Sequence, residues 1–431
     1  MNIGVVADDI TGANDIGIMF AKHNLTANVY SLGAGDQLLS QGMRLPAMAV
    51  IDTNSRLDSP ADAYAKVRQA TAKLRSVGYQ QFFNKTCSVF RGNIGAEFDA
   101  MLDELDAEFA VVVLGFPKNG RTTVDGIHYV AGQKLEDSAF RHDPIHPMRR
   151  SDLVGILQSQ TKRKVALITH QVIDQGEVAL RGQIEQMRAK CNYLILDVVD
   201  QASLGVIAKA VAKERIICGS SAIAEELAAL ATTESPLDVH MTLPVQNGYG
   251  ICCVAGSLTP QTKAQVAYMK AQGTPTIELE TTILFDETAR HSEIDRLTGD
   301  FVQHLKARRN PILHASHSIQ AFEATMEAGA RRGMTSEAVG RLVADTLSQI
   351  VQETRAQLPG LNRFVILGGE TSAAICKQLD VHAMAVWREI EPGLPSCISL
   401  TEPPFFLILK SGSFGQADFI KKAIDHLSES A

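Results

Sequence analysis

The stretch Ile3-Gly4-Val5-Val6-Ala7-Asp8-Asp9-Ile10-Thr11-Gly12 decides the expected fold, because an apolar strand passes through a polar turn into a helix. The run Ile3–Ala7 is continuously apolar, as in strands buried on both faces. The following segment places apolar residues at the spacing of one helical face: Ile16, Met19, Phe20 and His23. An apolar strand followed by an amphipathic helix recurs along the chain, which predicts an α/β protein whose mostly parallel sheets are flanked by helices.

The first half contains a series of expected strands: 3–7, 47–52, 81–84, 109–114, 165–168, 194–198 and 216–218. Its expected helices follow most of these strands: 11–23, 60–75, 94–105, 151–161, 176–190 and 221–230. In the second half we expect strands at 251–255, 277–280, 312–315, 364–367 and 405–410. The expected helices there are 259–272, 336–358, 371–379 and 416–427.

The alternation breaks once, at Thr232–Gly248, where two prolines and several turn-forming residues stand together. We therefore expect two domains, residues 1–235 and 249–431, joined by a linker at 236–248. Two α/β domains in one chain also predict an active-site cleft between them.

Composition narrows the class of protein. The chain has 431 residues, a formal net charge of −7 and 45% apolar residues, so it is expected to be globular and not to bind nucleic acid. No apolar run has the length of a membrane span, and acidic residues follow the N-terminus at once. The seven scattered cysteines form no CxxC pair. These features predict a cytoplasmic protein without membrane segments.

Polar residues follow the first three expected strands, at the edge where ligands bind in open α/β sheets. Asp8 and Asp9 end the first strand, and either a helix cap or a catalytic carboxylate pair explains them. Arg56 follows the second strand and suits capture of a carboxylate or phosphate, although a solvated surface Arg is an equal alternative. Lys85, with Thr86, Ser88, Arg91 and Asn93, follows the third strand just before a helix. That composition predicts an anion site.

Other residues of the first half are assigned less specific roles. Cys87 has no His or Asp near it in sequence, so we interpret it as a small packed thiol and not as a nucleophile. Lys118 and Arg121 add to the cationic loops. Prolines 144 and 147 prevent a helical metal site from His142 and His146, and the segment is expected to form a lid or a partner-contacting loop.

Three glycine-rich turns follow apolar strands in the second half: Gly256-Ser257, Gly368-Gly369-Glu370-Thr371 and Ser411-Gly412-Ser413-Phe414-Gly415. Glycine lets the backbone approach a ligand, and helix N-termini favour phosphates. Three such turns in one domain predict a nucleotide-phosphate site. None of them matches the P-loop or dinucleotide-binding pattern.

With these residues assembled, the chain resembles the four-carbon acid sugar kinase family over nearly its whole length. The resemblance is carried by these segments: ADDITGANDIG, KTCSVFRGNIGAE, GFPKNGRTTVDGIHYVAG, DPIHPMRRSD, VAGSLTPQT, LGGETSAAI, EPGLP and LKSGSFG. It implies an N-terminal acid-sugar-binding domain and a C-terminal nucleotide-binding domain. It also implies phosphorylation of the terminal hydroxyl of a four-carbon sugar acid, with ATP and Mg²⁺ as cofactors.

The resemblance also implies roles for individual residues. The implied substrate contacts are Asp9 with Asp8 beside it, Arg56, Lys85, Thr86, Cys87, Ser88 and Arg91. The implied ATP contacts are Ser257, Gly368, Gly369, Glu370, Thr371, Gly412 and Gly415. Metal ligands are not implied. Cys87 stands where threonate and erythronate members carry Asp, whereas Arg91-Gly92-Asn93 departs from 3-oxo-tetronate members. The resemblance therefore leaves the acid open, and we expect D-threonate, with D-erythronate and 3-oxo-tetronate as alternatives.

The expected mechanism assigns the carboxylate of the sugar acid to Arg56, Lys85 and Arg91, and the terminal hydroxyl to Asp8 or Asp9. Phosphoryl transfer requires mostly positioning and charge neutralisation, which such a site supplies. Lys410 either neutralises phosphates or simply flanks its turn. Two other classes of function stay open: an NAD-dependent sugar-acid dehydrogenase and a non-catalytic sugar-acid sensor. A homodimer is plausible from composition.

Overall fold

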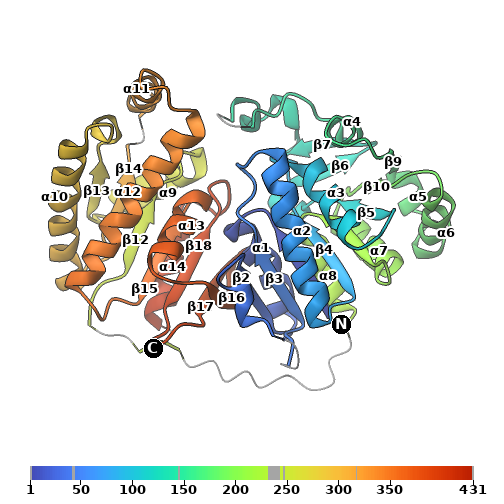
Figure 1. Cartoon of the computed structure of the whole chain (residues 1–431), viewed down its shortest axis with the longest axis horizontal. Coiled ribbons are helices and arrows are strands. Elements are labelled where there is room, and N and C mark those ends of the chain that lie inside the picture. Colours follow the sequence, from blue (N-terminus) through green and yellow to red (C-terminus); the bar gives the residue numbers. More distant parts are fainter. Residues whose placement is uncertain are drawn as a thin grey trace. The chain divides into compact units, whose positions relative to one another are not determined.

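The computed structural model describes residues 2–40, 44–143, 146–231, 243–245, 248–316 and 318–429. The chain divides into two compact units, Met1–Val239 and His240–Ala431, which we call the N-terminal and C-terminal units (Figure 1). Most of the expected linker 236–248 lies outside the described residues, so its bounds stay a prediction.

The N-terminal unit is built on a parallel sheet. Its strands lie in the order β2 (Ala27–Ser31), β3 (Met48–Asp52), β1 (Ile3–Ala7), β4 (Gln81–Lys85), β11 (Ile216–Gly219), β5 (Ala110–Val113), β10 (Tyr193–Leu196) and β9 (Val165–Ile168). Every residue of β1, β3 and β5 is buried, as expected for strands covered on both faces. The register places Ala7 opposite Asp52 on one side and Lys85 on the other, so the loops after these strands start level.

Helices connect these strands. They are α1 (Ile10–Ala21), α2 (Pro60–Val77), α3 (Ile94–Glu104), α4 (Leu153–Gln158), α5 (His170–Ile173), α6 (Glu177–Arg188), α7 (Gln201–Val211) and α8 (Ala222–Ala229). The Asp9 carboxylate caps α1 by accepting from the Gly12 backbone N–H. Ser59 caps α2, Pro60 begins that helix, and the left-handed Gly78 ends it. These local signals fix the helix that follows each strand.

A small antiparallel sheet was not expected from the sequence. It consists of β6 (Arg121–Val124), β7 (Ile127–Val130) and β8 (Gln133–Lys134). Asp125 and Gly126 connect β6 and β7 with φ values of 50° and 77°, as in the tight turns that suit hairpins. Short 3₁₀ turns complete the unit: η1 (Asp36–Leu38), η2 (Pro117–Asn119), η3 (Leu135–Asp137) and η4 (Ala139–His142).

The C-terminal unit has a mixed sheet. Its order is β13 (Thr276–Leu279), β14 (Ile312–Ala315), β12 (Cys252–Ala255), β15 (Arg363–Leu367), β18 (Phe406–Lys410), β17 (Leu394–Ser399) and β16 (Ala383–Glu391). The pairs from β13 to β18 are parallel, and β17 pairs antiparallel with both β18 and β16. The helices are α9 (Pro260–Ala271), α10 (Glu287–Lys306), α11 (Ile319–Ala330), α12 (Ser336–Gln357), α13 (Gly369–Gln378) and α14 (Phe419–Glu429), with η5 at Thr281–Ile283.

The core of the C-terminal unit combines strand and helix residues. Leu367 from β15, Phe406 from β18 and Phe419 from α14 belong to one buried cluster. Trp387 of β16 packs against this cluster, with its ring centroid 5.5 Å from Phe406 and 5.6 Å from His426. In the described part of the chain, no helix is apolar over a length that would cross a bilayer.

Gly219, at the end of β11, tests how closely the strand ends pack. Its φ is +140°, and a Cβ atom there would lie 1.9 Å from the Val113 carbonyl oxygen of β5. We expect Gly219→Ala to destabilise the N-terminal unit by about 2–4 kcal/mol, because both the backbone conformation and the contact are strained. Faster amide hydrogen exchange in β5 and β11 would report the loss.

Gly182 in α6 provides the control, since a Cβ atom there meets nothing within 4 Å. Gly182→Ala should stabilise α6 by about 0.5–1 kcal/mol through helix propensity. Equal exchange in Gly219→Ala and the parent protein would contradict the packing argument.

Candidate functional site

The ends of three neighbouring strands bring the expected sugar-acid residues together. In the sheet β1 lies between β3 and β4, and β11 follows β4. The loops are tied by backbone bonds: the Asp8 N–H donates to the Lys85 carbonyl at 3.3 Å, and the Arg56 N–H donates to the Asp8 carbonyl at 3.2 Å. The Thr86 N–H donates to the Gly219 carbonyl at 2.9 Å. Residues distant in sequence thus form one polar edge.

Arg56 joins the two expected catalytic carboxylates. Its Nε and Nη2 donate to the two oxygens of Asp8 at 2.8 and 2.7 Å, and its Nη1 donates to Asp9 Oδ2. The Asp9 Oδ1 also accepts from the Gly12 N–H at 2.6 Å. Burial opposes ionisation of Asp9, but Arg56 and Lys85 hold its pKa below the usual range. Asp9 is therefore ionised at neutral pH and able to accept a hydrogen bond from a hydroxyl.

Lys85 lies beside two residues that the sequence argument did not assign to the site, Asp15 and Ser221. Its Nζ is 3.4 Å from Asp15 Oδ2, and the Ser221 hydroxyl donates to the same oxygen at 2.6 Å. Burial raises the pKa of Asp15 although Lys85 opposes the shift. A Cβ atom at Gly12 would lie 3.0 Å from Lys85 Nζ, so glycine leaves room for the ammonium over the start of α1. In the sequence, the available signal for Asp15 was a pair of polar residues, Asn14 and Asp15, in an otherwise mostly apolar helix.

Arg91 and Cys87 form the outer part of this edge. Arg91 Nη1 donates to Asp143 Oδ2 at 2.5 Å, and its guanidinium lies 5.4 Å from the Phe140 ring centroid. Burial would raise the pKa of the Cys87 thiol, but the Arg91 and Arg56 guanidinium groups bring it below its usual value. Cys87 is half-buried, while the other cysteines of the chain are buried, so it is not simply a core thiol. The expected lid segment thus reaches the site through Asp143.

His128 of β7 supports the turn after β4. Its Nε2 lies 2.9 Å from the Ser88 carbonyl and its Nδ1 lies 3.0 Å from Thr123 Oγ1. Burial lowers the pKa of His128 to about 4, so the imidazole is neutral and acts as a fixed hydrogen-bonding strut. Beside this turn, the Thr86 hydroxyl is buried without a hydrogen-bond partner among the described residues. A ligand hydroxyl or carboxylate would satisfy it.

Two further buried carboxyl groups lie under the site. Burial, reinforced by Asp9 and Asp8, raises the pKa of Asp52 to about 7. Burial and the Asp8 charge raise the pKa of Glu97 to about 8, while its Oε1 accepts from the Ser55 hydroxyl at 2.7 Å. Glu97 therefore carries a proton at neutral pH and fixes the loop that presents Arg56. Sequence spacing did not indicate either group.

In the C-terminal unit, the three expected glycine turns meet. They follow β12, β15 and β18, which are adjacent and parallel. The Ser257 N–H donates to the Leu367 carbonyl at 3.3 Å, and the Gly368 N–H donates to the Lys410 carbonyl at 2.8 Å. A Cβ atom at Gly412 would lie 2.3 Å from Ser257 Oγ. The expected residues Ser257, Gly368 and Gly412 therefore gather at one edge of the sheet.

This edge fits an anion such as a nucleotide phosphate. The turn at Gly368 opens α13, so backbone N–H groups and the positive end of the helix dipole face the same edge. The Ser372 hydroxyl in the first turn of α13 is buried and has no partner in the described chain. Gly369, Glu370 and Thr371 belong to this first turn, while Gly415 closes the third loop with a φ of +83°. Mg²⁺ bound to phosphates needs only one or two protein carboxylates. Glu370 is the acidic residue in the first turn of α13, so it could supply such a ligand.

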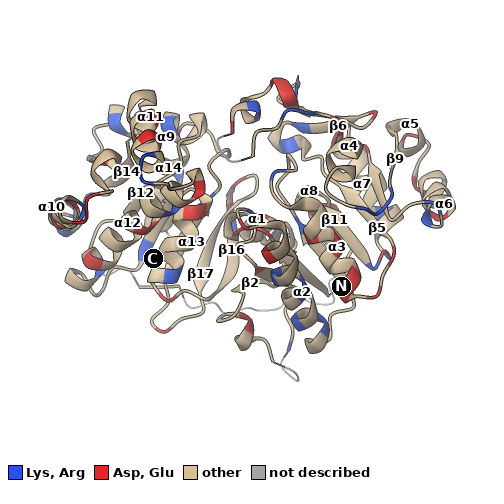
Figure 2. Ribbon diagram, turned by 45° about the horizontal axis from the view of Figure 1, so that its top comes forward, with Lys and Arg blue, Asp and Glu red and all other residues tan. Residues whose placement is uncertain are grey.

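The structure also gives partners to the two other members of the expected cationic set, Lys118 and Arg121. Lys118 Nζ donates to both oxygens of Glu225 at 2.8 Å, and Arg121 Nη1 donates to the Asn119 carbonyl. The Lys118 contact joins η2 to α8, whereas the Arg121 charge acts on Cys87, Asp15 and Arg91 of the site. Figure 2 shows basic and acidic residues interspersed, for example along α10. The positive charges at the site are therefore those of Arg56, Lys85 and Arg91, with Arg121 near Cys87 and Arg91.

Among the described residues, one group has the spacing of a metal site: Asp125, His170 and Asp197. Its candidate ligand atoms lie within 4.8 Å of one another. However, the Asp197 carboxylate already accepts three backbone N–H bonds, from Asp125, Gly126 and His170. We interpret this group as an anchor for the β6–β7 turn and the start of α5.

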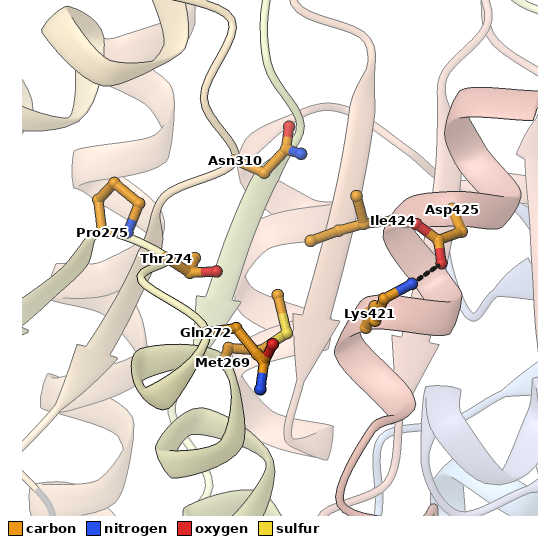
Figure 3. Close-up of a pocket in the computed structure, with 8 residues that line it drawn as sticks. All are labelled: Met269, Gln272, Thr274, Pro275, Asn310, Lys421, Ile424 and Asp425. Carbon is orange, nitrogen blue, oxygen red and sulfur yellow. Dashed lines mark hydrogen bonds and ion pairs between the residues drawn. The ribbon is translucent and has the colours of Figure 1, made fainter.

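A separate hollow of about 260 Å³ lies in the C-terminal unit (Figure 3). Its lining includes Thr274 and Asn310, which precede β13 and β14, and an ion pair of 2.6 Å between Lys421 and Asp425 of α14. It therefore lies at the amino ends of the strands, whereas the glycine turns lie at their carboxyl ends. The hollow is not the expected nucleotide site.

Each of the two units matches a family of known proteins. Residues 3–227 match the family model of a sugar-binding N-terminal domain, and residues 252–420 match that of a nucleotide-binding C-terminal domain. A 3-oxo-tetronate kinase of Pseudomonas fluorescens is 33% identical, with 99% of this chain and 97% of the relative covered. A 3-oxo-tetronate kinase of Burkholderia multivorans is also 33% identical, covering 100% of this chain and 98% of the relative.

Solved structures show the same architecture. A Salmonella typhimurium LT2 protein described as a candidate tRNA synthase matches with a TM-score of 0.78 and 27% identity, covering 98% of each chain. A Haemophilus influenzae protein from a family described as a domain of unknown function matches with a TM-score of 0.71 and 26% identity, covering 98% of this chain and all of that one. The two matched models define a class of proteins with a sugar-binding N-terminal domain and a nucleotide-binding C-terminal domain. The chain belongs to the four-carbon acid sugar kinase family.

Glu97→Gln tests the buried proton under the site. The pKa of Glu97 is about 8 in the folded state against a usual value of 4.5, so the folded protein holds a proton that the unfolded chain releases between these pH values. Stability of the parent protein is therefore lost as pH rises through this window. Glutamine keeps an acceptor for Ser55 without titrating, so Glu97→Gln should gain stability relative to the parent from pH 5 to pH 9 in calorimetry.

Glu185→Gln on the exposed surface of α6 is the control, because its side chain is 61% exposed and bonds only neighbouring Arg188 in the structure as described. This variant should not gain stability with rising pH. A constant difference between Glu97→Gln and the parent at all pH values would contradict the assignment of a proton to Glu97.

Proposed function

We propose that the chain transfers the γ-phosphoryl group of ATP to the terminal, C4 hydroxyl of a 3-oxo-tetronate. Membership of its family makes the chain a sugar-acid kinase. The observation that carries the finer proposal is geometric: Arg56, Lys85 and Arg91 border a carboxylate pair at one sheet edge, which suits a small hydroxy acid. Relatives named 3-oxo-tetronate kinase over nearly their full length favour this acid over D-threonate.

The N-terminal unit supplies binding of the acid. The bonds of Arg56 to Asp8 and Asp9 use three of its five N–H donors, which leaves donors for a substrate carboxylate. Lys85 adds a fixed positive charge near Gly12, and Arg91 adds another beside Cys87. The two oxygens of Asp8 accept hydrogen bonds from Arg56 Nε and Nη2, and Asp8 therefore positions the guanidinium group. These residues orient the acid and neutralise its charge.

Asp9 is proposed to receive the proton of the reacting hydroxyl or to align that hydroxyl. Its lowered pKa makes it a weak base, which suffices because phosphoryl transfer depends mainly on positioning. In the C-terminal unit, Ser257, the turn from Gly368 to Thr371 and the turn from Gly412 to Gly415 are proposed to hold ATP. Bound ATP with Mg²⁺ supplies the phosphoryl group. The cleft between the two domains stays part of the proposal.

Other functions are less well supported. An NAD-dependent dehydrogenase and a non-catalytic sensor do not fit membership of a kinase family. D-threonate and D-erythronate stay in view as substrates because Arg91-Gly92-Asn93 departs from the pattern expected for 3-oxo-tetronate members. A homodimer also stays a prediction.

A screen of acids tests the substrate. ADP release should be measured with D- and L-threonate, D- and L-erythronate and the 3-oxo acids at equal concentrations. We expect kcat/KM for a 3-oxo-tetronate to exceed that of each threonate and erythronate by roughly tenfold or more, since a site built around one pattern of oxygens rejects others. A higher kcat/KM with D-threonate would restore the expectation from the motifs alone.

Asp9→Asn tests the role of the carboxylate pair. The substitution keeps an acceptor for the Gly12 N–H but removes the charge, so kcat should fall by about 10²–10⁴ with modest change in ATP affinity. Steady-state kinetics with both substrates varied would measure the two effects. The control is Asp62→Asn at the exposed start of α2, which should retain parent activity. Near-parent kcat in Asp9→Asn would remove Asp9 from this role.

A further inference from the structure

Lys410 is a cation buried inside the C-terminal unit, directly under the third glycine turn. It is the last residue of β18, and its exposed fraction is 0%. Among the described residues no carboxylate lies within ion-pair distance of its Nζ. Buried lysines are rare and usually paired, so an unpaired one needs a structural or functional reason.

Four oxygen atoms surround the ammonium group. Lys410 Nζ donates to the carbonyls of Ser411, Gly412 and Phe414 at 2.7, 3.0 and 3.0 Å, and it lies 3.2 Å from Thr262 Oγ1. Three carbonyls of one turn therefore point inward at the same cation. The ammonium group fills the inner side of this turn.

The inward carbonyls determine where the N–H groups point. In a trans peptide the carbonyl and the N–H of the next residue lie on opposite sides of the bond. The N–H groups of Gly412, Ser413 and Gly415 therefore point away from Lys410. No acceptor for these three N–H groups is found within the described part of the chain. Such a set of outward backbone N–H groups is an anion-binding arrangement.

Side chains of α9 hold the same turn. Thr259 Oγ1 and Thr262 Oγ1 donate to the Gly412 carbonyl at 2.6 and 3.1 Å. Gln265 Nε2 donates to the Phe414 carbonyl at 3.1 Å and to the Gln416 carbonyl at 3.0 Å. The Gly412 carbonyl thus accepts from three side chains, which leaves it no freedom to turn outward.

We propose that Lys410 is a positioning residue that never touches the nucleotide but holds the Ser411–Gly415 turn so that its N–H groups bind a phosphate. This inference rests on the proposed function, because it assumes that the C-terminal unit binds a nucleotide. The sequence left two roles for Lys410, and the proposed role differs from both. The cation does not neutralise phosphates directly, and it does more than flank the turn.

The surroundings of Lys410 make this role sensitive to pH. Burial lowers the pKa of Lys410 to about 7, and Glu391 of β16 opposes the shift. The α9 side chains that face it, Thr262 and Gln265, are uncharged. The ammonium group has three N–H donors, one for each of the three carbonyls, whereas a neutral amine has two, so the turn should loosen as pH rises through about 7. ADP affinity should therefore fall from pH 6 to pH 8.5.

The test measures binding of ADP and of adenosine to the full-length chain by isothermal titration calorimetry, with Lys410→Met as the main variant. Methionine has a similar length but no donor. At pH 6 we expect ADP to bind Lys410→Met roughly 10- to 100-fold more weakly than the parent, since the loosened turn no longer aims its backbone N–H groups at the charged phosphate. Adenosine, which has no phosphate, should bind both proteins equally. The parent affinity for ADP should approach that of the variant at pH 8.5.

Two further variants keep the test decisive. Lys421→Met removes an exposed lysine of α14 that pairs only with Asp425 among the described bonds, and it should bind ADP as the parent does. Thr262→Val serves if Lys410→Met does not fold, and it should weaken ADP binding in the same direction by a smaller factor.

The outcomes separate the inference from the function. If the parent does not bind ADP, the proposed function fails. If the parent binds ADP and folded Lys410→Met binds it equally well, the positioning role of Lys410 is wrong. Equal losses for ADP and adenosine would also overturn it, because they would indicate general damage to the unit.

Discussion

The parallel alignment of neighbouring strands is the constraint on which both candidate sites depend. In each unit, three adjacent parallel strands end level, so loops that are distant in sequence start side by side. In the N-terminal unit those loops carry charged side chains, and in the C-terminal unit they carry glycines. One arrangement of the backbone therefore supports recognition of a small acid by side chains and recognition of a phosphate by backbone N–H groups.

The two sites solve the problem of buried charge differently. The N-terminal site packs carboxylates against cations: Arg56 binds both Asp8 and Asp9, and Asp15 lies against Lys85 and Ser221. Removing one partner would leave another charge buried and unpaired, which is strongly destabilising. The C-terminal site surrounds a single cation with carbonyl and hydroxyl oxygens. There the charge is spread over neutral dipoles and organises the backbone.

Much of the fold was readable from the sequence because apolar strands and capped helices follow one another. The bounds expected for β1, β9 and β14 are those observed. The expectation missed β2 (Ala27–Ser31), whose five residues mix apolar and polar side chains, and the antiparallel β16 and β17, which a bulge interrupts. It also missed α7, α10 and α11. Local signals for these helices were present, because Asp200 and Ser203 form a capping box for α7, and Asp286 and Ser318 cap α10 and α11.

The candidate sites were predictable only in part. Strand-end position identified Arg56, Lys85 and the glycine turns, because topology brings strand ends together. It gave no sign that Arg56 would bind both Asp8 and Asp9, that Asp143 would reach Arg91, or that Glu97 would hold a proton. Such contacts join residues 42 or more positions apart, and their existence depends on side-chain packing that local sequence does not encode.

Trp387 gives the molecule a spectroscopic asymmetry. It is the single tryptophan of the chain, and it packs on Phe406 and His426 in the core of the C-terminal unit. Tryptophan emission therefore reports on the C-terminal unit alone, while ellipticity reports on both. Comparing the two signals along one denaturation curve would reveal whether the units unfold together or in sequence, without any engineered label.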